Sequence, residues 1–301
     1  MTVLIFDGSH LLQRMKFVAV KENRISSKYM SWLLFRSLIK KCVENQPSRI
    51  YVLWDEGACT YRHKIVEGYK ESRINNNPSE KDVLAFREFL DSRRYLHEIL
   101  PTIGVVSIKV PGVEADDWGH YLSNKFDTGV LVSEDKDWLL NLRPGWKLIR
   151  PIIKEEYTWE SFDEMMNERY YKNPTEYTHY DPLKKYLIMK AVYGDKDEVP
   201  RITTPAPAKK IIDYLTGQIK SLDPKEKSTL DNSRKELARN LRLAATDWLT
   251  VHPELIDSEG IHQSELNRVT YKSKENFLKV ASELNLFQYI NKWHKISERL
   301  S

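Results

Sequence analysis

Residues 2–9 read Thr-Val-Leu-Ile-Phe-Asp-Gly-Ser, a short run of β-branched and apolar residues that ends on an acid. Such a run predicts a buried strand over 2–6, with Asp7 at its carboxyl end. Four similar runs follow, and they predict strands over 49–54, 104–109, 128–132 and 146–150. Longer amphipathic stretches separate these runs in the N-terminal half. This alternation is typical of an α/β fold with a mostly parallel central sheet and flanking helices.

The rest of the chain carries apolar residues at helical spacing. One helix is expected over about 28–45, and another after Ser79, which forms a capping signal with Asp82. Beyond about residue 158 the strand-like runs stop, and helices are expected over 159–171, 181–193, 205–217, 231–250 and 273–297. The sequence therefore predicts an α/β domain over 1–190 and a helical region over 191–301.

Composition excludes several classes of protein. The 301 residues hold 47 basic and 43 acidic side chains, a net charge of +4 that does not by itself suggest a nucleic-acid partner. No apolar run approaches the roughly 18–20 residues of a membrane helix, and residues 1–7 do not resemble a signal peptide. We therefore expect a cytoplasmic protein without a membrane partner. The two cysteines and eight histidines lack the spacing of a disulfide framework or a zinc site.

Acidic residues gather at the ends of the predicted strands. Asp7 and Asp55 end the first two strands, and five further acids follow the third and fourth: Glu114, Asp116, Asp117, Asp135 and Asp137. The carboxyl ends of parallel strands share one edge of a sheet, so we expect these seven acids to converge. Taken alone, Glu114 or Asp135 is better explained as an acid at the N-terminus of a helix than as a metal ligand, because the helix dipole favours acids there. The whole set is different, because like charges held together require cations.

The ligand type favours magnesium. Oxygen donors without His or Cys favour Mg²⁺, with Mn²⁺ as a substitute, and two such ions at one site suit phosphodiester hydrolysis. The chain lacks a G-x-x-x-x-G-K-[ST] loop, which argues against a nucleotide triphosphatase. Asp7 is followed by Gly8-Ser9, which argues against hydrolases with an Asp-x-Asp nucleophile motif. The acids therefore predict hydrolysis of nucleic acid.

The segment after Asp55 mixes basic and aromatic side chains. Residues 61–73 read Tyr-Arg-His-Lys-Ile-Val-Glu-Gly-Tyr-Lys-Glu-Ser-Arg, which combines phosphate-binding groups with rings on which bases stack. An ordinary amphipathic helix explains this composition about as well, but the nearby acids favour a nucleic-acid contact. A second basic stretch over 220–242 is more often a solvated helix face than a phosphate track.

In their order and spacing, five motifs of this chain resemble those of the 5′ nuclease superfamily. That group includes flap endonucleases, the 5′–3′ exonuclease domain of bacterial DNA polymerase I, and free-standing phage enzymes such as the ribonuclease H of T-even phages. The motifs are Phe6-Asp7-Gly8-Ser9, Trp54-Asp55 with Arg62-x-x-Ile65-x-x-x-Tyr69-Lys70-x-x-Arg73, Gly112-Val113-Glu114-Ala115-Asp116-Asp117, Val132-Ser133-Glu134-Asp135-Lys136-Asp137, and Gly194-Asp195-Lys196-Asp197-Glu198. The resemblance covers roughly residues 2–215. It implies a PIN-like nuclease domain over 1–190 with a helical arch at about 61–100.

The resemblance also implies roles for individual residues. Asp7, Asp55, Glu114 and Asp116 are expected at one metal ion, and Asp117, Asp135, Asp137 and Asp195 at a second. Glu198 replaces the Asp that ends the family's last motif, and Asp197 is a possible substitute for it. Lys70 and Arg73 are expected to act on the scissile phosphate together with the acids Asp116 and Asp117. Nucleic-acid contacts are expected from Arg62, Lys64, Tyr69, Lys70, Arg73, Lys209 and Lys210, although a structural salt bridge is a nearly equal alternative for Arg62.

The family usually continues after its last acidic motif into a glycine-rich hairpin that binds duplex phosphates. Residues 199–210 of this chain contain no glycine, so we expect duplex binding there to be altered. Of the 43 acids, nine belong to the expected metal set, and the remaining 34 face 47 basic residues. The near balance of charge therefore conceals a basic surface around an acidic site, which is favourable for binding nucleic acid.

The resemblance implies an enzyme of replication or repair that cuts 5′ flaps or 5′ strands of DNA and RNA–DNA hybrids near a single-strand/duplex junction. A single-stranded-DNA-binding protein or a sliding clamp is a candidate partner. Two alternatives stay open. One is a nucleic-acid-binding replication protein with a vestigial nuclease site, and the other is a PIN-like ribonuclease acting on structured RNA.

Overall fold

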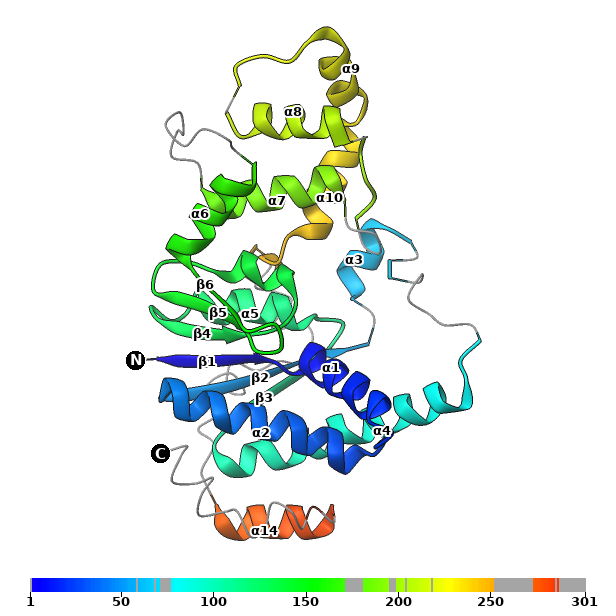
Figure 1. The fold of residues 1–301 in the computed structure, drawn as a ribbon, viewed down its shortest axis with the longest axis vertical. Coiled ribbons are helices and arrows are strands. Elements are labelled where there is room, and N and C mark those ends of the chain that lie inside the picture. Colours follow the sequence, from blue (N-terminus) through cyan, green and yellow to red (C-terminus); the bar gives the residue numbers. More distant parts are fainter. Residues whose placement is uncertain are drawn as a thin grey trace.

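A six-stranded sheet forms the centre of the computed structural model, which describes residues 2–57, 59–67, 69–70, 77–170, 181–194, 199–203, 205–217, 219–251, 273–284 and 286 (Figure 1). The strands are β1 (Val3–Asp7), β2 (Arg49–Glu56), β3 (Val106–Pro111), β4 (Gly129–Val132), β5 (Trp146–Arg150) and β6 (Glu155–Thr158). Their order across the sheet is β3-β2-β1-β4-β5-β6. The first five strands run parallel and β6 pairs antiparallel with β5, which confirms the predicted mostly parallel sheet.

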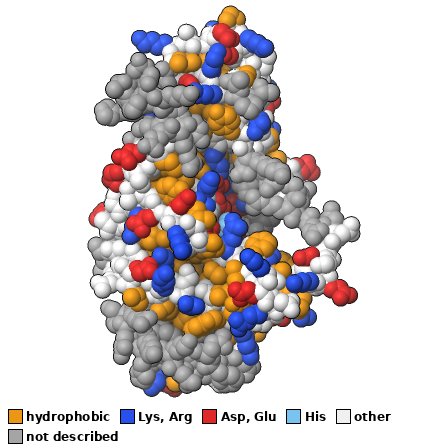
Figure 2. Space-filling model, in the orientation of Figure 1, with side chains coloured by type: hydrophobic (Ala, Val, Ile, Leu, Met, Phe, Trp, Pro, Cys, Tyr) orange, Lys and Arg blue, Asp and Glu red, His pale blue; other side chains and the backbone are white. Residues whose placement is uncertain are grey.

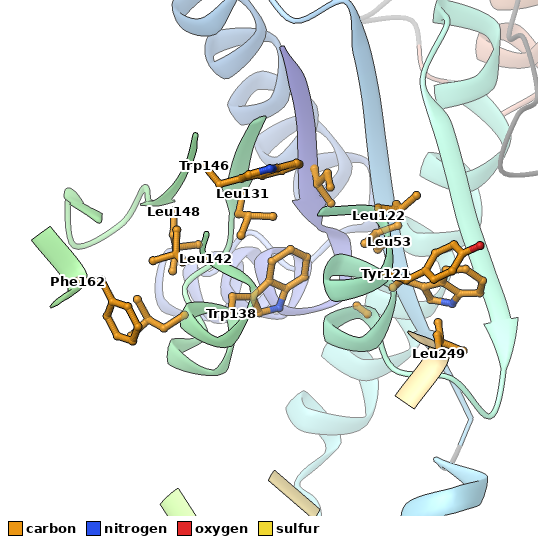
Figure 3. Close-up of a cluster of buried hydrophobic side chains, with 14 of the residues drawn as sticks. Leu53, Tyr121, Leu122, Leu131, Trp138, Leu142, Trp146, Leu148, Phe162 and Leu249 are labelled. Atoms are coloured by element: carbon orange, nitrogen blue, oxygen red, sulfur yellow. The ribbon is translucent and has the colours of Figure 1, made fainter. Parts of the chain in front are cut away.

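Helices cover both faces of the sheet because side chains of each strand alternate between the two faces. Leu4 and Phe6 of β1 pack in a cluster with helices α1 (Gly8–Lys21), α2 (Ser27–Asn45) and α4 (Glu80–Ile99). Val3 and Ile5 pack on the opposite face, in the cluster that Figure 3 shows with Trp138 and Trp146. That second face is covered by α5 (Ala115–Ser123), the 3₁₀ helix η3 (Lys136–Asn141) and α6 (Trp159–Tyr170).

The remaining helices extend the molecule beyond the sheet. They are α3 (Thr60–Ile65), the 3₁₀ helix η2 (Leu100–Ile103), α7 (Pro182–Tyr193), α8 (Pro205–Leu215), α9 (Pro224–Asn232), α10 (Arg234–Ala244), α11 (Trp248–Val251) and α14 (Lys274–Glu283). Helices α7 to α10 form a helical region at one end of the molecule, at the top of Figure 1. Helix α14 instead returns to the α/β part, where the Ser273 N–H donates to the Thr102 carbonyl at 3.0 Å. Among the described helices, none has the length and hydropathy that crossing a bilayer requires.

The predicted elements differ from the observed ones at several places. Helices α1 and α5, the 3₁₀ helices η2 and η3, and strand β6 were not expected from the sequence. In place of one helix expected over 231–250, the structure has the end of α9, then α10 and α11. The helix expected over 273–297 is observed as α14, and the part of that range beyond 286 lies outside the described residues. Helix α1 was not predicted because no loop separates it from β1. Asp7 both ends β1 and caps α1, and its side chain accepts a hydrogen bond from the His10 N–H.

Gly8 lets α1 begin directly against strand β2. A Cβ at this position would lie 2.9 Å from the Leu53 carbonyl oxygen and 2.8 Å from side-chain atoms of Val52 and Trp54. We therefore expect Gly8→Ala to lower the free energy of unfolding by about 1–3 kcal/mol, the usual cost of overpacking a core. Urea denaturation measures this change. If Gly8→Ala has the same free energy of unfolding as the unmodified chain, α1 can move away from β2 to accommodate the Cβ without loss of stability.

Candidate active site

A cavity of about 390 Å³ lies at the carboxyl ends of the central strands. Five carboxylates line it, and they come from four separate segments of the chain: Asp7, Asp55, Glu114, Asp116 and Asp135. The strand order reverses between β1 and β4, which is the position at which open α/β sheets form ligand sites. In Figure 2, Lys and Arg side chains border acidic side chains in the hollow at the middle of the face shown. The structure thus brings together five of the nine predicted metal-ligating acids.

The backbone and nearby hydroxyls hold the first two carboxylates in place. The Asp7 side chain accepts from the His10 N–H at 2.9 Å and from the Ser133 hydroxyl at 2.6 Å. Asp55 follows on the neighbouring strand, and its carboxylate accepts from the Ala115 N–H at 2.8 Å. These hydrogen bonds hold the Asp7 and Asp55 carboxylates at the same cavity. The bond from the Ala115 N–H also connects Asp55 to α5, the helix that carries Asp116.

Three of the five cavity carboxylates, Asp7, Asp55 and Asp116, have raised pKa values in the absence of a cation. Burial, with a contribution from the Asp55 charge, raises the pKa of Asp7 to about 7. The surrounding protein atoms desolvate Asp55 even though its side chain is exposed to the cavity. This desolvation and the charge of Glu114 raise the pKa of Asp55. Burial and the Asp117 charge raise the pKa of Asp116 well above its ordinary value. Oxygen donors that repel one another in this way fit hard divalent cations, because such ions bind carboxylates and offset the repulsion.

Asp135 has a different environment from the other four carboxylates. It caps η3, where it accepts from the Asp137 N–H at 3.0 Å, and its second oxygen lies 3.6 Å from Nδ1 of His10. Desolvation opposes its charge, but the bonds from His10 and the Asp137 N–H outweigh it and lower the pKa of Asp135. His10 was not predicted as a site residue, although its spacing of three residues from Asp7 was a signal that could have identified it.

Arg62 is buried within an acidic network instead of facing a ligand. Its guanidinium donates to both Asp117 oxygens, at 2.9 and 3.0 Å, and to Glu114. Desolvation opposes the charge, but Asp117 and Glu114 outweigh it and raise the pKa of Arg62 well above its ordinary value. The side chain is only 1% exposed, so the prediction of a phosphate contact is corrected to the salt-bridge alternative. Asp117 is fully buried and also accepts from the Tyr61 hydroxyl, which leaves it outside the cavity wall.

The Arg62 guanidinium also occupies a group of atoms that resembles a metal site. One ligand atom each of Cys59, Glu114 and Asp117 lies within 4.8 Å of the others. Arg62 Nη1 contacts all three residues, including Cys59 Sγ at 3.6 Å. The cation in this group is therefore the arginine itself, and the cavity beside it is the better candidate for a divalent ion.

Lys70 lies at the cavity as predicted. Its ammonium group is 2.7 Å from Glu114 Oε1, and the backbone has a φ of 61°, a left-handed conformation uncommon for a residue other than glycine. The neighbouring Tyr69 is only 4% exposed and packs with Cys59, Tyr61 and Leu243. The ring of Tyr69 is thus held inside the protein in this structure, and its predicted contact with a base remains a prediction.

Arg93 is a cavity residue that the sequence analysis missed. One guanidinium nitrogen donates to the Asp55 carbonyl oxygen at 2.9 Å, and another pairs with Glu56 at 3.0 Å. It comes from the second half of α4, far along the chain from the basic segment that the sequence singled out. The only sequence signal was a pair of arginines, Arg93 and Arg94, on a helix expected in the arch.

Other predicted site residues lie elsewhere. Asp137 forms an ion pair with Lys190 of α7 and is not among the described residues that line the cavity. Lys64 is exposed on α3, while Lys209 and Lys210 are exposed on α8, where Lys210 pairs with Glu226 at 2.5 Å. Arg73, Asp195, Asp197 and Glu198 lie outside the described residues.

The raised carboxylate pKa values predict a pH-dependent metal affinity. A carboxylate must lose its proton to bind Mg²⁺, and the pKa of Asp7 is about 7. Acidification from pH 8 to pH 6 therefore protonates Asp7, and we expect Mg²⁺ affinity to fall by about tenfold. Calorimetric titration at the two pH values measures the change, and Asp213→Asn on α8 should reproduce the unmodified profile. Equal affinity at pH 6 and pH 8 would contradict the raised values.

Sequence and structure comparisons place this geometry among known proteins. Residues 2–171 match the family model of the 5′–3′ exonuclease N-terminal resolvase-like domain. A 5′–3′ exonuclease of Aquifex aeolicus is 29% identical over 209 residues, covering 67% of this chain and 64% of that protein. A 5′–3′ exonuclease of Mycoplasmopsis pulmonis is 30% identical over 140 residues, covering 45% of this chain and 43% of that protein. The chain thus spans less than two thirds of the length of these curated relatives.

The fold is similar to that of a solved phage enzyme. A bacteriophage T5 flap endonuclease, in a pseudo-enzyme-product complex with DNA and metal ions, aligns with a TM-score of 0.67 at 21% sequence identity. The alignment covers 94% of this chain and all of the phage chain. The family model covers more than half of the chain, and its range contains the five cavity carboxylates. The chain therefore belongs to the family of the 5′–3′ exonuclease N-terminal resolvase-like domain.

Proposed function

We propose that this protein is a divalent-metal-dependent 5′ nuclease that hydrolyses phosphodiesters in 5′ flaps or 5′ strands of DNA and of RNA–DNA hybrids. The observation that carries the proposal is the gathering of five carboxylates from four chain segments in one cavity, with Lys70 at its wall. The raised pKa values of Asp7, Asp55 and Asp116 mean that their negative charges are unfavourable in the cavity unless a cation binds them. Two hard divalent cations would offset these charges, because such ions bind several carboxylate oxygens.

The chain's own residues divide the work of the site between binding cations and binding phosphate. Asp7, Asp55, Glu114, Asp116 and Asp135 would hold Mg²⁺, or Mn²⁺ in its place, through their carboxylate oxygens. Bound divalent ions supply water with a lowered pKa and neutralise charge that develops on the phosphate. Lys70 would bind the scissile phosphate, because it offers a positive charge at the cavity wall. Its present partner, Glu114, would bind a metal ion instead of the Lys70 ammonium group.

Further parts of the proposal rest on the family resemblance. Arg73 would join Lys70 at the phosphate, and Asp195 with Glu198 would complete the second metal site. The region over 191–301, including the exposed Lys209 and Lys210, would bind duplex DNA next to the nuclease domain over 1–190. We also propose a role in replication or repair in the cytoplasm of a bacterium or a phage-infected host, with a single-stranded-DNA-binding protein or sliding clamp as partner.

A panel of labelled substrates tests this proposal. The substrates are a 5′ flap, a nicked duplex, a gapped duplex and a matching RNA–DNA hybrid, each incubated with the full chain in Mg²⁺. Cleavage from the 5′ side that leaves 5′-phosphate and 3′-hydroxyl ends is expected. Cleavage of structured RNA with no activity on any 5′ DNA end would instead support a PIN-like ribonuclease and would contradict the proposed substrate class.

A further inference from the structure

Asn141 connects the two elements that carry the cavity acids Asp116 and Asp135. It is the last residue of η3, and Asp135 caps the start of the same 3₁₀ helix. Its Nδ2 donates to the Asp116 carbonyl oxygen at 3.2 Å, in the first turn of α5. A carbonyl oxygen can only accept, so the amide nitrogen of Asn141 is the atom that faces it. The η3 helix is therefore tied to α5 at a residue whose carboxylate lines the cavity.

The packing of η3 against α5 is close at the same place. Gly119 lies about one helical turn after Asp116 on α5. A Cβ at this glycine would be 2.9 Å from Asn141 Nδ2 and 3.1 Å from the ring of Trp138, which itself lines the cavity. A larger residue at position 119 would force η3 away from α5. The separation of the two acid-bearing elements therefore depends on this contact.

A third segment holds the Asn141 amide in this orientation. Thr246 lies between α10 and α11, and its hydroxyl donates to Asn141 Oδ1 at 3.1 Å. Asn141 is fully buried and Thr246 is only 4% exposed, so water does not compete for these bonds. Helix α11 follows Thr246 and packs against α5, with Leu249 in the buried cluster that Figure 3 shows. A hydrogen-bonded path thus runs from the chain beyond α10 to the cavity.

The same part of the chain also reaches a second cavity acid. Residues 243–246, which we call the α10–α11 segment, offer two carbonyl oxygens to Arg62, and Arg62 also donates to Glu114. Asn141 and Thr246 are not among the described residues that line the cavity. Their effect on a bound cation would therefore pass through the acids that they hold in place.

We propose that Asn141 and Thr246 are positioning residues, which fix Asp116 and Asp135 in the arrangement that binds divalent cations. Mg²⁺ binds its oxygen donors in a strict geometry, so a small shift of one carrier helix weakens binding. Groups that hold the donors in place affect metal affinity without contacting the ion. The inference rests on the proposed nuclease function and deepens it, because it assigns two buried residues outside the cavity to the metal site.

Binding of Mn²⁺ alone, measured by calorimetric titration of the full chain without nucleic acid, tests this inference. Thr246→Val keeps the shape of the side chain and removes the hydroxyl, so Asn141 Oδ1 loses this donor. We expect Mn²⁺ affinity to fall about tenfold, the usual loss when a group that holds a metal ligand is removed. Thr246→Ser keeps the hydroxyl and should retain the affinity of the unmodified chain.

Thr216→Val is the matched control. Thr216 is also fully buried, and its hydroxyl donates to the Ile212 carbonyl oxygen at 2.8 Å, at the end of α8. Each valine variant loses a buried hydroxyl, so thermal denaturation should show a similar loss of stability in the two. Only Thr246→Val should bind Mn²⁺ more weakly. If both variants keep the Mn²⁺ affinity of the unmodified chain, the Thr246 bond serves the fold alone and the inference is overturned.

Two further measurements use the same variants. Asn141→Leu has a side chain of similar size but removes both hydrogen bonds, so its Mn²⁺ affinity should fall further; if it does not fold, Thr246→Val decides the matter. In cleavage of a 5′ flap, the Mg²⁺ concentration that gives half the maximal rate should rise about tenfold in Thr246→Val. The KM for the flap at saturating Mg²⁺ should stay unchanged, because the buried Thr246 does not contact nucleic acid.

Two outcomes separate this inference from the proposed function. If the unmodified chain binds Mn²⁺ but cuts no substrate, the nuclease proposal fails, and the Mn²⁺ affinities of Thr246→Val and Thr216→Val still decide the positioning role. If the chain cuts 5′ flaps and Thr246→Val binds Mn²⁺ as tightly as the unmodified chain, the positioning role is excluded while the nuclease proposal stands.

Discussion

Asp116→Asn is expected to reduce cleavage by on the order of 1,000-fold while leaving the metal-free protein at least as stable as the unmodified chain. Activity is lost because the amide of asparagine offers a cation a neutral oxygen in place of the charged carboxylate oxygen. Charge stabilisation at such sites contributes several kcal/mol. The gain or retention of stability follows because burial and the Asp117 charge raise the pKa of Asp116. A buried acid whose pKa is raised in the folded state lowers the stability of the protein as the pH rises above the pKa that the acid has in the unfolded chain. Asparagine does not titrate and has no such effect.

Single-turnover cleavage and thermal denaturation in EDTA at pH 8 measure the two effects. Asp231→Asn on α9 is the matched control, since this exposed acid pairs with Arg234 away from the cavity. Its activity and stability should equal those of the unmodified chain. An Asp116→Asn variant that unfolds earlier than the unmodified protein would show that this carboxylate serves the fold and not a cation.

The second large effect concerns Arg62. Arg62→Leu should lower the free energy of unfolding by about 3–5 kcal/mol, the range for breaking a buried ion pair from one side. The substitution leaves Asp117 fully buried without its guanidinium partner, and it removes the bonds to the Leu243 and Ala245 carbonyl oxygens at 3.2 and 2.9 Å. These two bonds connect α3 to the end of α10, so the helical region should also become easier to unfold.

Urea denaturation measures this loss, with Lys64→Leu as control on the same helix. Lys64 is exposed, and its replacement should change the free energy of unfolding by less than about 0.5 kcal/mol. Arg62→Lys keeps one positive charge but cannot contact both Asp117 oxygens and Glu114 together, so an intermediate loss is expected. If Arg62→Leu and Lys64→Leu are equally stable, the network does not hold α3 against the site.

Strand ends were readable from the sequence because their physical signals are local. The five predicted strands are observed within two residues at each end, since their short length and their β-branched residues favour strands over helices. The convergence of Asp7 and Asp55 followed from the parallel arrangement, which places neighbouring strand ends together. Strand β6 was missed because its residues, Glu155 to Thr158, lie at a solvated sheet edge and carry no buried apolar pattern.

The distinction between Asp116 and Asp117 could not be read from the sequence. The two adjacent residues lie on α5, and successive helical residues point about 100° apart, so only one of them faces the cavity. Which one depends on how α5 packs, and that depends on Trp118 and Leu122 in the core. The Arg62 contacts are similarly out of reach, because its partner Leu243 is 181 residues away in the sequence.

Cleavage of a 5′-flap DNA by the full chain, first in EDTA and then after adding Mg²⁺, tests the central claim most directly. The cavity carboxylates predict no cleavage in EDTA and cleavage near the flap junction once Mg²⁺ is present, with loss of that activity in Asp116→Asn. Tight flap binding in Ca²⁺ with no cleavage in Mg²⁺ or Mn²⁺ would contradict the claim, because it would show that the five carboxylates belong to a vestigial nuclease site.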